Sequence, residues 1–167
     1  MKTNDKQRLV HTIDPVYDED SRILILGSFP SVRSRQSHFF YGHPQNRFWK
    51  VTSAVFEEEV PETLDEKKGF LLKNHIAIWD VIHSCEIIGS SDASIENVEI
   101  NDLSIILDHC DISQIYVNGK TAEKLYRRYM KDLYHKDCIA LPSTSPANAA
   151  WTLEKLIEGW KRIRERK

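Results

Sequence analysis

Short apolar runs, separated by amphipathic stretches, define the elements that this chain is expected to form. Residues 22–26 (RILIL) end at Gly27, and residues 76–81 (IAIWDV), 114–117 (QIYV) and 138–141 (CIAL) have the same character. Short continuous runs of β-branched and other apolar residues are typical of strands buried on both faces, as in parallel sheets. The pattern therefore predicts four buried strands.

The stretches between these runs predict helices. Residues 46–56 (NRFWKVTSAVF) place apolar side chains near helical spacing, and Pro44 stands just upstream, where a helix start tolerates proline. Further helices are predicted over residues 64–73, 102–107, 121–130 and 153–164, with a polar loop over residues 90–97. Strands that alternate with helices predict an α/β fold, in which helices cover both faces of a parallel sheet.

The ends of the predicted strands suggest where a site would form. In an open parallel sheet, ligands bind at the carboxyl ends of the strands. The turns at Gly27, Asp80, Asn118 and Pro142 are therefore expected to converge on one site.

The composition is that of an ordinary globular protein. The chain has 167 residues, of which 41% are hydrophobic and 29% charged, and we expect one domain over residues 1–167. The amino terminus shows no apolar stretch typical of a secretion signal, and no apolar run approaches the ~20 residues that a bilayer requires. We therefore expect a cytoplasmic protein with no membrane partner.

Charge and cysteine content exclude several classes of function. A formal net charge of −2 argues against a protein that coats nucleic acid through bulk electrostatics, although Arg33, Arg35 and Arg47 surround an aromatic segment and can act locally. The three cysteines form no CxxC pair, and the seven histidines show no HExxH spacing. We therefore expect neither a disulfide framework nor a metal or other cofactor.

Two familiar catalytic motifs are incomplete. The sequence NGKT from Asn118 resembles the end of a phosphate-binding loop, but Gln114 stands where that loop requires glycine. Ser28 follows a strand, but Leu26 and Pro30 occupy the places where a nucleophile elbow needs glycine. Nucleotide triphosphate hydrolysis and serine hydrolase chemistry are therefore not supported.

Three motifs, in order along the chain, carry a resemblance to a known family. They are ILILGSFPSVRSRQSHFFYGHPQNRFWKV (residues 23–51), IYVNG (115–119) and LPSTSPAN (141–148). Together they resemble the uracil-DNA glycosylase superfamily, and within it most closely the DNA-deoxyinosine (hypoxanthine) glycosylase branch, over about residues 13–160.

The resemblance implies a three-layer α/β/α fold around a four-stranded parallel sheet. It also implies a monofunctional enzyme of base excision repair, which extrudes a deaminated nucleotide from DNA and hydrolyses its N-glycosidic bond. Extrusion is needed because an enzyme cannot reach its target atoms inside the base stack. Hypoxanthine would be the first substrate, with xanthine or uracil after it. The expected partner is DNA that contains such a base, and the expected working state is a monomer.

The resemblance also assigns tasks to single residues. Ser28 and Phe29 would face the base through their backbone amides, and Tyr41 would stack on it. Asn118 would read the base edge, whereas an Asn-Gly pair outside this family would simply form a turn. The residues that would contact the DNA itself are Ser31, Arg47, Ser143, Thr144, Ser145 and Asn148.

One position departs from the superfamily pattern. Many members carry Asp or Asn just before the proline of the first motif, where it activates the attacking water, but Phe29 stands there in this chain. Asn46 matches an asparagine implicated in the hypoxanthine branch, although it could instead cap the following helix. Because an amide is a poor base, Asp80 joins Asn46 as a catalytic candidate, and Asp92 is a second carboxylate to consider. Asp80 could merely orient the site, and Asp92 could cap a turn.

Two other functions remain open at this point. The first is a lesion-binding module that has lost catalysis because Phe29 replaces the water-activating residue. The second is a hydrolase of free nucleosides or nucleotides, which would leave the LPSTSP loop without DNA to grip.

Overall fold

A computed structural model describes residues 6–11, 13–89 and 91–166, the side chain of residue 166 excepted. The strands are β1 (Gln7–Val10), β2 (Ile23–Gly27), β3 (Ile76–Asp80), β4 (Ile82–Ile87), β5 (Glu96–Ile100), β6 (Gln114–Asn118) and β7 (Cys138–Leu141). The helices are α1 (Val32–Ser37), α2 (Phe48–Val55), α3 (Leu64–Lys73), α4 (Ser104–Leu107), α5 (Lys120–Tyr129), α6 (Lys131–Tyr134) and α7 (Leu153–Trp160), with 3₁₀ helices η1 (Asp92–Ser94) and η2 (Lys161–Arg166).

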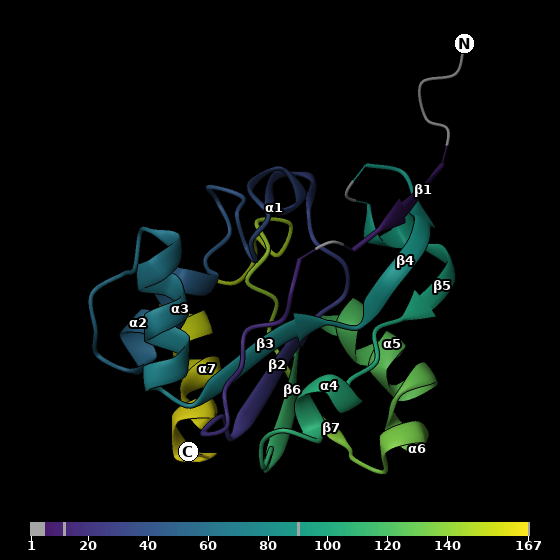
Figure 1. Cartoon of the computed structure of the whole chain (residues 1–167). Helices are drawn as coiled ribbons and strands as arrows, with labels where there is room; N and C mark the ends of the chain where they lie inside the picture. Colours follow the sequence, from purple (N-terminus) through teal and green to yellow (C-terminus); the bar gives the residue numbers. More distant parts are fainter. Residues whose placement is uncertain (1–5, 12, 90, 167) are drawn as a thin grey trace.

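The four predicted strands form a parallel sheet in the order β3-β2-β6-β7. Helices α2, α3 and α7 lie on one side of this sheet, and α4, α5 and α6 lie on the other (Figure 1). Every residue of β2 and β3 is buried, as expected for strands covered on both faces. The predicted α/β fold with a four-stranded parallel sheet is therefore confirmed.

Aromatic packing joins helices α2 and α7 to each other and to the loop at the carboxyl end of β7. Phe48 at the start of α2 and Trp160 at the end of α7 are fully buried, and their rings meet edge to face at 5.7 Å. The indole Nε1 of Trp160 also donates to the Pro142 carbonyl at 2.8 Å. Helix α7 therefore holds the loop that follows β7.

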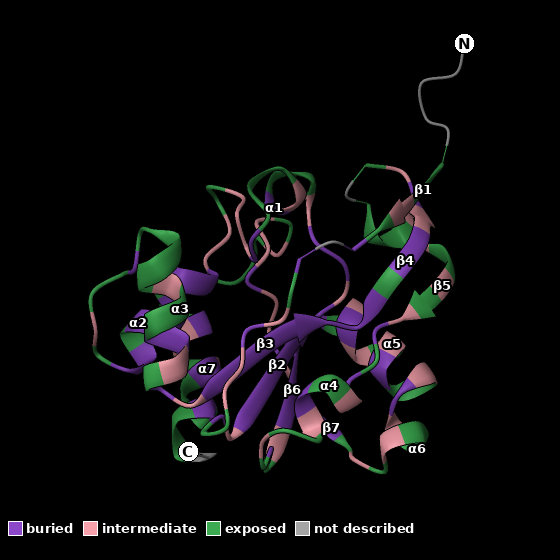
Figure 2. Cartoon of the chain, viewed as in Figure 1, coloured by how far each residue is buried: buried purple, intermediate pink, exposed green. Residues whose placement is uncertain are grey.

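A second sheet, antiparallel and in the order β1-β4-β5, is not predicted by the sequence pattern. Residues 90–97 were expected to be a polar loop, but they contain η1 and the first residues of β5. The buried surface of Figure 2 is concentrated in the central strands, whereas β5 is exposed or half-buried. A pattern of hydrophobic residues arises where side chains are buried. An outer strand with exposed side chains therefore has little such pattern from which it could be predicted.

The junction between the two sheets is held by a buried amide. The chain passes from β3 to β4 through the single residue Val81, whose N–H donates to the Gly27 carbonyl at 2.8 Å. Asn101 donates from Nδ2 to the carbonyls of Asp80 at 2.9 Å and Ile82 at 3.2 Å. These bonds hold Asp80 at the carboxyl end of β3.

Replacing Asn101 by alanine removes this donor from two buried carbonyls. A buried polar group left without a partner costs about 1–3 kcal/mol, so the free energy of unfolding in urea is expected to fall by roughly that amount. Gln36→Ala, at an exposed amide on α1, is the matched control and should change it by less than about 0.5 kcal/mol. An Asn101→Ala protein as stable as the parent would contradict this account of the junction.

Candidate active site

A cavity of about 350 Å³ lies at the carboxyl ends of the parallel strands. Its volume falls at the lower end of the ~300–1,000 Å³ typical of small-molecule sites. Ten of the twelve predicted site residues line it: Ser28, Phe29, Ser31, Tyr41, Asn46, Asp80, Asn118, Ser143, Thr144 and Ser145. The strand ends thus bring together side chains that are far apart in the sequence.

Arg47 and Asn148 do not line the cavity. The guanidinium of Arg47 donates to the carbonyls of Trp151 at 2.5 Å and Asn148 at 3.1 Å, and Asn148 Nδ2 donates to the Ser143 carbonyl at 2.9 Å. Both side chains brace the loop that follows β7. Their contact with DNA stays a prediction.

Thr144 is fully buried and joins two asparagines. Its N–H donates to Asn118 Oδ1 at 3.1 Å, and its Oγ1 accepts from Asn118 Nδ2 at 3.0 Å. The same hydroxyl donates to Asn46 Oδ1 at 2.9 Å, and the Thr144 carbonyl accepts from the Arg47 N–H at 3.0 Å. Thr144 therefore makes its hydrogen bonds inside the protein, and its contact with DNA stays a prediction.

The orientation of the Asn46 amide follows from these contacts. Its Oδ1 accepts from the Phe48 N–H and from the Thr144 hydroxyl, both at 2.9 Å. A backbone N–H can only donate, so the accepting atom must be the oxygen. Both lone pairs are used, and within the described residues Nδ2 has no partner. Asn46 therefore supports the first N–H of α2, although Arg47 is the cap residue, and it offers the cavity only hydrogen-bond donors.

Tyr41 presents one side of its ring to the cavity, because Phe48 stacks on the other at 4.0 Å and 11°. Its backbone is left-handed (φ 54°), which is uncommon for a residue with a side chain, and the next N–H, of Gly42, donates to Ser34 Oγ at 2.9 Å. The Tyr41 hydroxyl is buried and lies near the Asn118 side chain. Burial raises the pKa of Tyr41 and the charge of Asp80 adds to this, whereas the Asn118 amide acts in the opposite direction.

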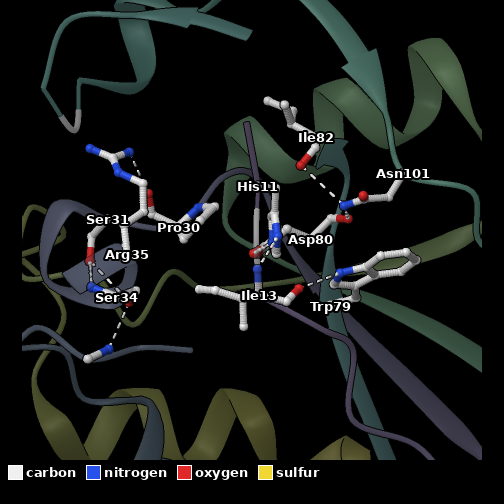
Figure 3. Close-up of polar contacts among 11 residues, drawn as sticks. His11, Ile13, Pro30, Ser31, Ser34, Arg35, Trp79, Asp80, Ile82 and Asn101 are labelled. Carbon is white, nitrogen blue, oxygen red and sulfur yellow. Dashed lines mark hydrogen bonds and ion pairs between the residues drawn. The ribbon is translucent and has the colours of Figure 1, made fainter. Parts of the chain in front are cut away.

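Asp80 is buried at the end of β3, where its Oδ2 lies 2.7 Å from Nε2 of His11. Figure 3 shows the two side chains pointing toward one another. A Cβ atom on Gly27 would lie 2.5 Å from Asp80 Oδ1, so glycine at this position allows the carboxylate to approach the backbone closely. His11 is not predicted from the sequence, since no motif links it to Asp80, 69 residues away.

Asp92 lies at the cavity wall in η1, and the residue as a whole is exposed. The Ser28 hydroxyl donates to its Oδ1 at a long 3.5 Å. Partial burial of the carboxylate raises the pKa of Asp92 and the charge of Asp80 adds to this, whereas the hydroxyls of Thr121 and Ser28 act in the opposite direction. Its side chain does not cap η1.

The serines of the two site loops brace their own turns. Ser31 Oγ accepts from the Ser34 N–H at 3.1 Å and caps α1, and Ser143 Oγ accepts from the Ser145 N–H at 3.1 Å. Ser145 Oγ accepts from the Ala147 N–H at 3.1 Å. The hydroxyl protons of Ser143 and Ser145 remain available to a phosphate oxygen.

A sequence profile described as the uracil DNA glycosylase superfamily matches residues 15–164. The chain belongs to the uracil DNA glycosylase superfamily. The resemblance seen in the three motifs is thereby confirmed.

Named relatives within the superfamily cover most of the chain. A hypoxanthine DNA glycosylase from Methanosarcina barkeri is 33% identical over 148 residues, which are 87% of this chain and 92% of the relative. One from Methanosarcina acetivorans is 34% identical over 150 residues, 89% and 93% of the two chains. A solution NMR structure of a candidate uracil DNA glycosylase from M. acetivorans has a TM-score of 0.75 at 29% identity, covering 90% of this chain and 96% of that one.

Phe29, which stands just before the proline of the first motif, contributes an apolar wall in this superfamily member. It is 9% exposed, and its ring packs edge to face against His11 at 6.1 Å and beneath the Arg35 guanidinium at 5.5 Å. The cavity persists beside this ring. Phe29 has no group that could activate water, so any proton acceptor must come from elsewhere in the site.

Across residues 6–11, 13–89 and 91–166, no cluster of three or more His, Cys, Asp or Glu side chains is placed to hold a metal ion. In the same ranges, no helix is long and apolar enough to cross a bilayer.

Thr144→Val removes the hydroxyl that connects Asn118 to Asn46 and keeps the side-chain shape. Because two partly buried amide groups lose a partner, the free energy of unfolding is expected to fall by about 0.5–1.5 kcal/mol. The side-chain amide NMR signals of both asparagines should also shift. Thr144→Ser, which keeps the hydroxyl, is the control for the amide signals. Unchanged amide signals in Thr144→Val would contradict the network.

Asp92→Asn is expected to raise Tm at about pH 7.5, because the raised native pKa means that ionisation of Asp92 destabilises the fold there. The difference should vanish at about pH 3, below the ordinary pKa of aspartate of about 3.9, where the carboxyl is protonated in both states. Thermal unfolding at several pH values measures both effects. Asp111→Asn, at an exposed loop position, is the control. If Asp92→Asn had a lower Tm than the parent at about pH 7.5, the assigned direction of the Asp92 pKa shift would be wrong.

Proposed function

We propose that this member of the superfamily is a monofunctional DNA glycosylase that removes hypoxanthine from DNA, and xanthine or uracil more slowly. The observation that carries the proposal is the convergence of Tyr41, Asn46, Asp80 and Asn118 on one cavity at the strand ends. The names of the Methanosarcina relatives point to the same substrate.

Recognition of the extruded base rests on Tyr41 and Asn118. The free side of the Tyr41 ring offers a stacking platform, an interaction worth about 1–3 kcal/mol per base. One lone pair and one N–H of the Asn118 amide are used by Thr144, which leaves one acceptor and one donor for the base and the nearby Tyr41 hydroxyl. Hypoxanthine presents N1–H and O6, a complementary pair, whereas adenine presents a ring acceptor and an amino donor in these places.

In the proposed reaction, the buried carboxylate of Asp80 acts on the sugar. As the bond between C1′ and N9 breaks, its electron pair leaves with the base and positive charge develops on the sugar. An ionised Asp80 beside this charge stabilises it, since a fixed anion acts strongly where water is excluded. Water then forms the new bond at C1′ and passes its proton to Asp80 Oδ1, while the departing base takes a proton from solvent.

Asn46 supports the departing base and the water rather than accepting a proton. Its two Nδ2 hydrogens have no acceptor among the described residues, and both lone pairs of Oδ1 are occupied. Donors aimed at the charge that develops on a leaving base lower the barrier to its departure. Asp92 serves as a secondary carboxylate at the cavity wall.

The test is a panel of end-labelled duplexes that each hold one hypoxanthine, xanthine or uracil, treated with protein and then with alkali and run on a denaturing gel. Strand cleavage only after alkali is expected for hypoxanthine, because a monofunctional enzyme leaves an intact abasic site. Asp80→Asn is expected to lower the rate by about 100-fold or more, in the range of lost charge stabilisation or proton transfer. Asp92→Asn is the matched carboxylate control, and it should lower the rate less than Asp80→Asn does.

Other outcomes of this assay identify the competing functions. Selective binding of the damaged duplex without an abasic product would indicate a lesion-binding module. Release of hypoxanthine from inosine in the absence of DNA would indicate a nucleoside hydrolase. Either result would refute the proposed function.

A further inference from the structure

His11 contacts Asp80, which lines the cavity, from outside the residues that the superfamily profile matches. The superfamily profile begins at residue 15, whereas His11 follows β1 of the small sheet. Its N–H donates to the His83 carbonyl at 2.5 Å, which ties this segment to β4. The His11 side chain is 1% exposed and that of Asp80 is 5% exposed. A buried contact at 2.7 Å between two such groups is sheltered from solvent.

The proton on the His11 ring can be placed from its neighbours. The Ile13 N–H donates to Nδ1 at 3.2 Å, and a backbone N–H can only donate, so Nδ1 carries no proton. The proton of the ring therefore sits on Nε2 and is donated to Asp80 Oδ2. In this arrangement Asp80 is the acceptor and remains a carboxylate.

Aromatic side chains lock the orientation of the ring. The ring centroids of Phe29, Phe40 and Trp79 lie 6.1, 6.2 and 6.4 Å from that of His11. Figure 3 shows His11 and Asp80 side by side, with Asn101 bonded to the Asp80 carbonyl. The Asp80 main chain and one of its carboxylate oxygens are thus both held in place.

The second oxygen of Asp80 is held over Gly27. An added Cβ there would lie 2.5 Å from Asp80 Oδ1 and 3.4 Å from the Tyr41 hydroxyl, and all three residues line the cavity. A carboxylate bonded through Oδ2 and packed against bare backbone at Oδ1 has one orientation.

We infer that His11 is a positioning residue, which holds Asp80 as a carboxylate with Oδ1 directed at the reacting sugar. This inference rests on the proposed function. A preorganised anion stabilises developing positive charge without reorganising during the reaction, whereas a rotating carboxylate loses part of that effect. The segment that precedes the family match then belongs to the active site.

The test compares three variants in single-turnover release of hypoxanthine from the duplex, with the Kd for DNA measured in parallel. His11→Leu removes the donor to Asp80 and is expected to lower the rate about 10–100-fold, as for a misplaced catalytic group, while Kd stays within about twofold. His11→Gln, whose terminal amide can donate to Oδ2, should recover much of the rate.

Arg8→Gln is the matched control, because it removes the bonds from the Arg8 guanidinium to the Asn97 carbonyl and to Ser84 Oγ. This change loosens the same N-terminal segment but leaves the contact between His11 and Asp80 in place, so the rate should stay close to that of the parent. Equal losses in Arg8→Gln and His11→Leu, or no loss in His11→Leu, would overturn the positioning role. Urea denaturation shows which variants are folded.

A second readout does not depend on base release. ¹⁵N NMR of the His11 ring in the parent protein should show a neutral ring protonated at Nε2, and Asp80→Asn should perturb its signals. A ring protonated at Nδ1 would overturn the inference even if the enzyme is active. If the parent releases no base, the proposed function fails, and the positioning role of His11 in catalysis fails with it. The NMR signals of the His11 ring would still show whether His11 contacts Asp80, so the two failures can be told apart.

Discussion

A chain of hydrogen bonds from Asn118 through Thr144 to Asn46 holds the candidate active site together. It joins the end of β6, the loop after β7 and the start of α2, across 26 and 98 residues of sequence. Each bond is directional, and the single hydroxyl of Thr144 accepts from one amide and donates to the other. Burial strengthens such a network and makes a missing partner costly. The arrangement therefore sets which donors and acceptors face the cavity.

The two carboxylates of the cavity differ because their surroundings differ. Asp80 is buried and contacts His11, whereas Asp92 is exposed at the wall with a pKa raised by partial burial and by Asp80. Environments of this kind separate the roles of paired carboxylates in many hydrolases. Serine hydroxyls and backbone amides suit contact with phosphates, since they do not require the net positive charge that this chain lacks.

Much of the fold is readable from local pattern, and the exceptions have one cause. The four parallel strands are nearly continuous apolar runs because helices bury both of their faces, and α3 begins and ends at the predicted residues 64 and 73. The small antiparallel sheet escapes prediction because β1 and β5 are largely exposed. It nevertheless shapes the site, since Asn101 follows β5 and binds the carbonyl of Asp80.

The sequence by itself determined the α/β class, the family and the clustering of ten predicted residues at the strand ends, because buried strands and contiguous motifs leave a local record. Only the tertiary structure decided what each side chain does there. It placed Thr144 inside the protein, turned Arg47 to brace a loop, limited Asn46 to donating and brought His11 onto Asp80. The physical reason is that these bonds join residues far apart in the chain, where no spacing records which donor will meet which acceptor.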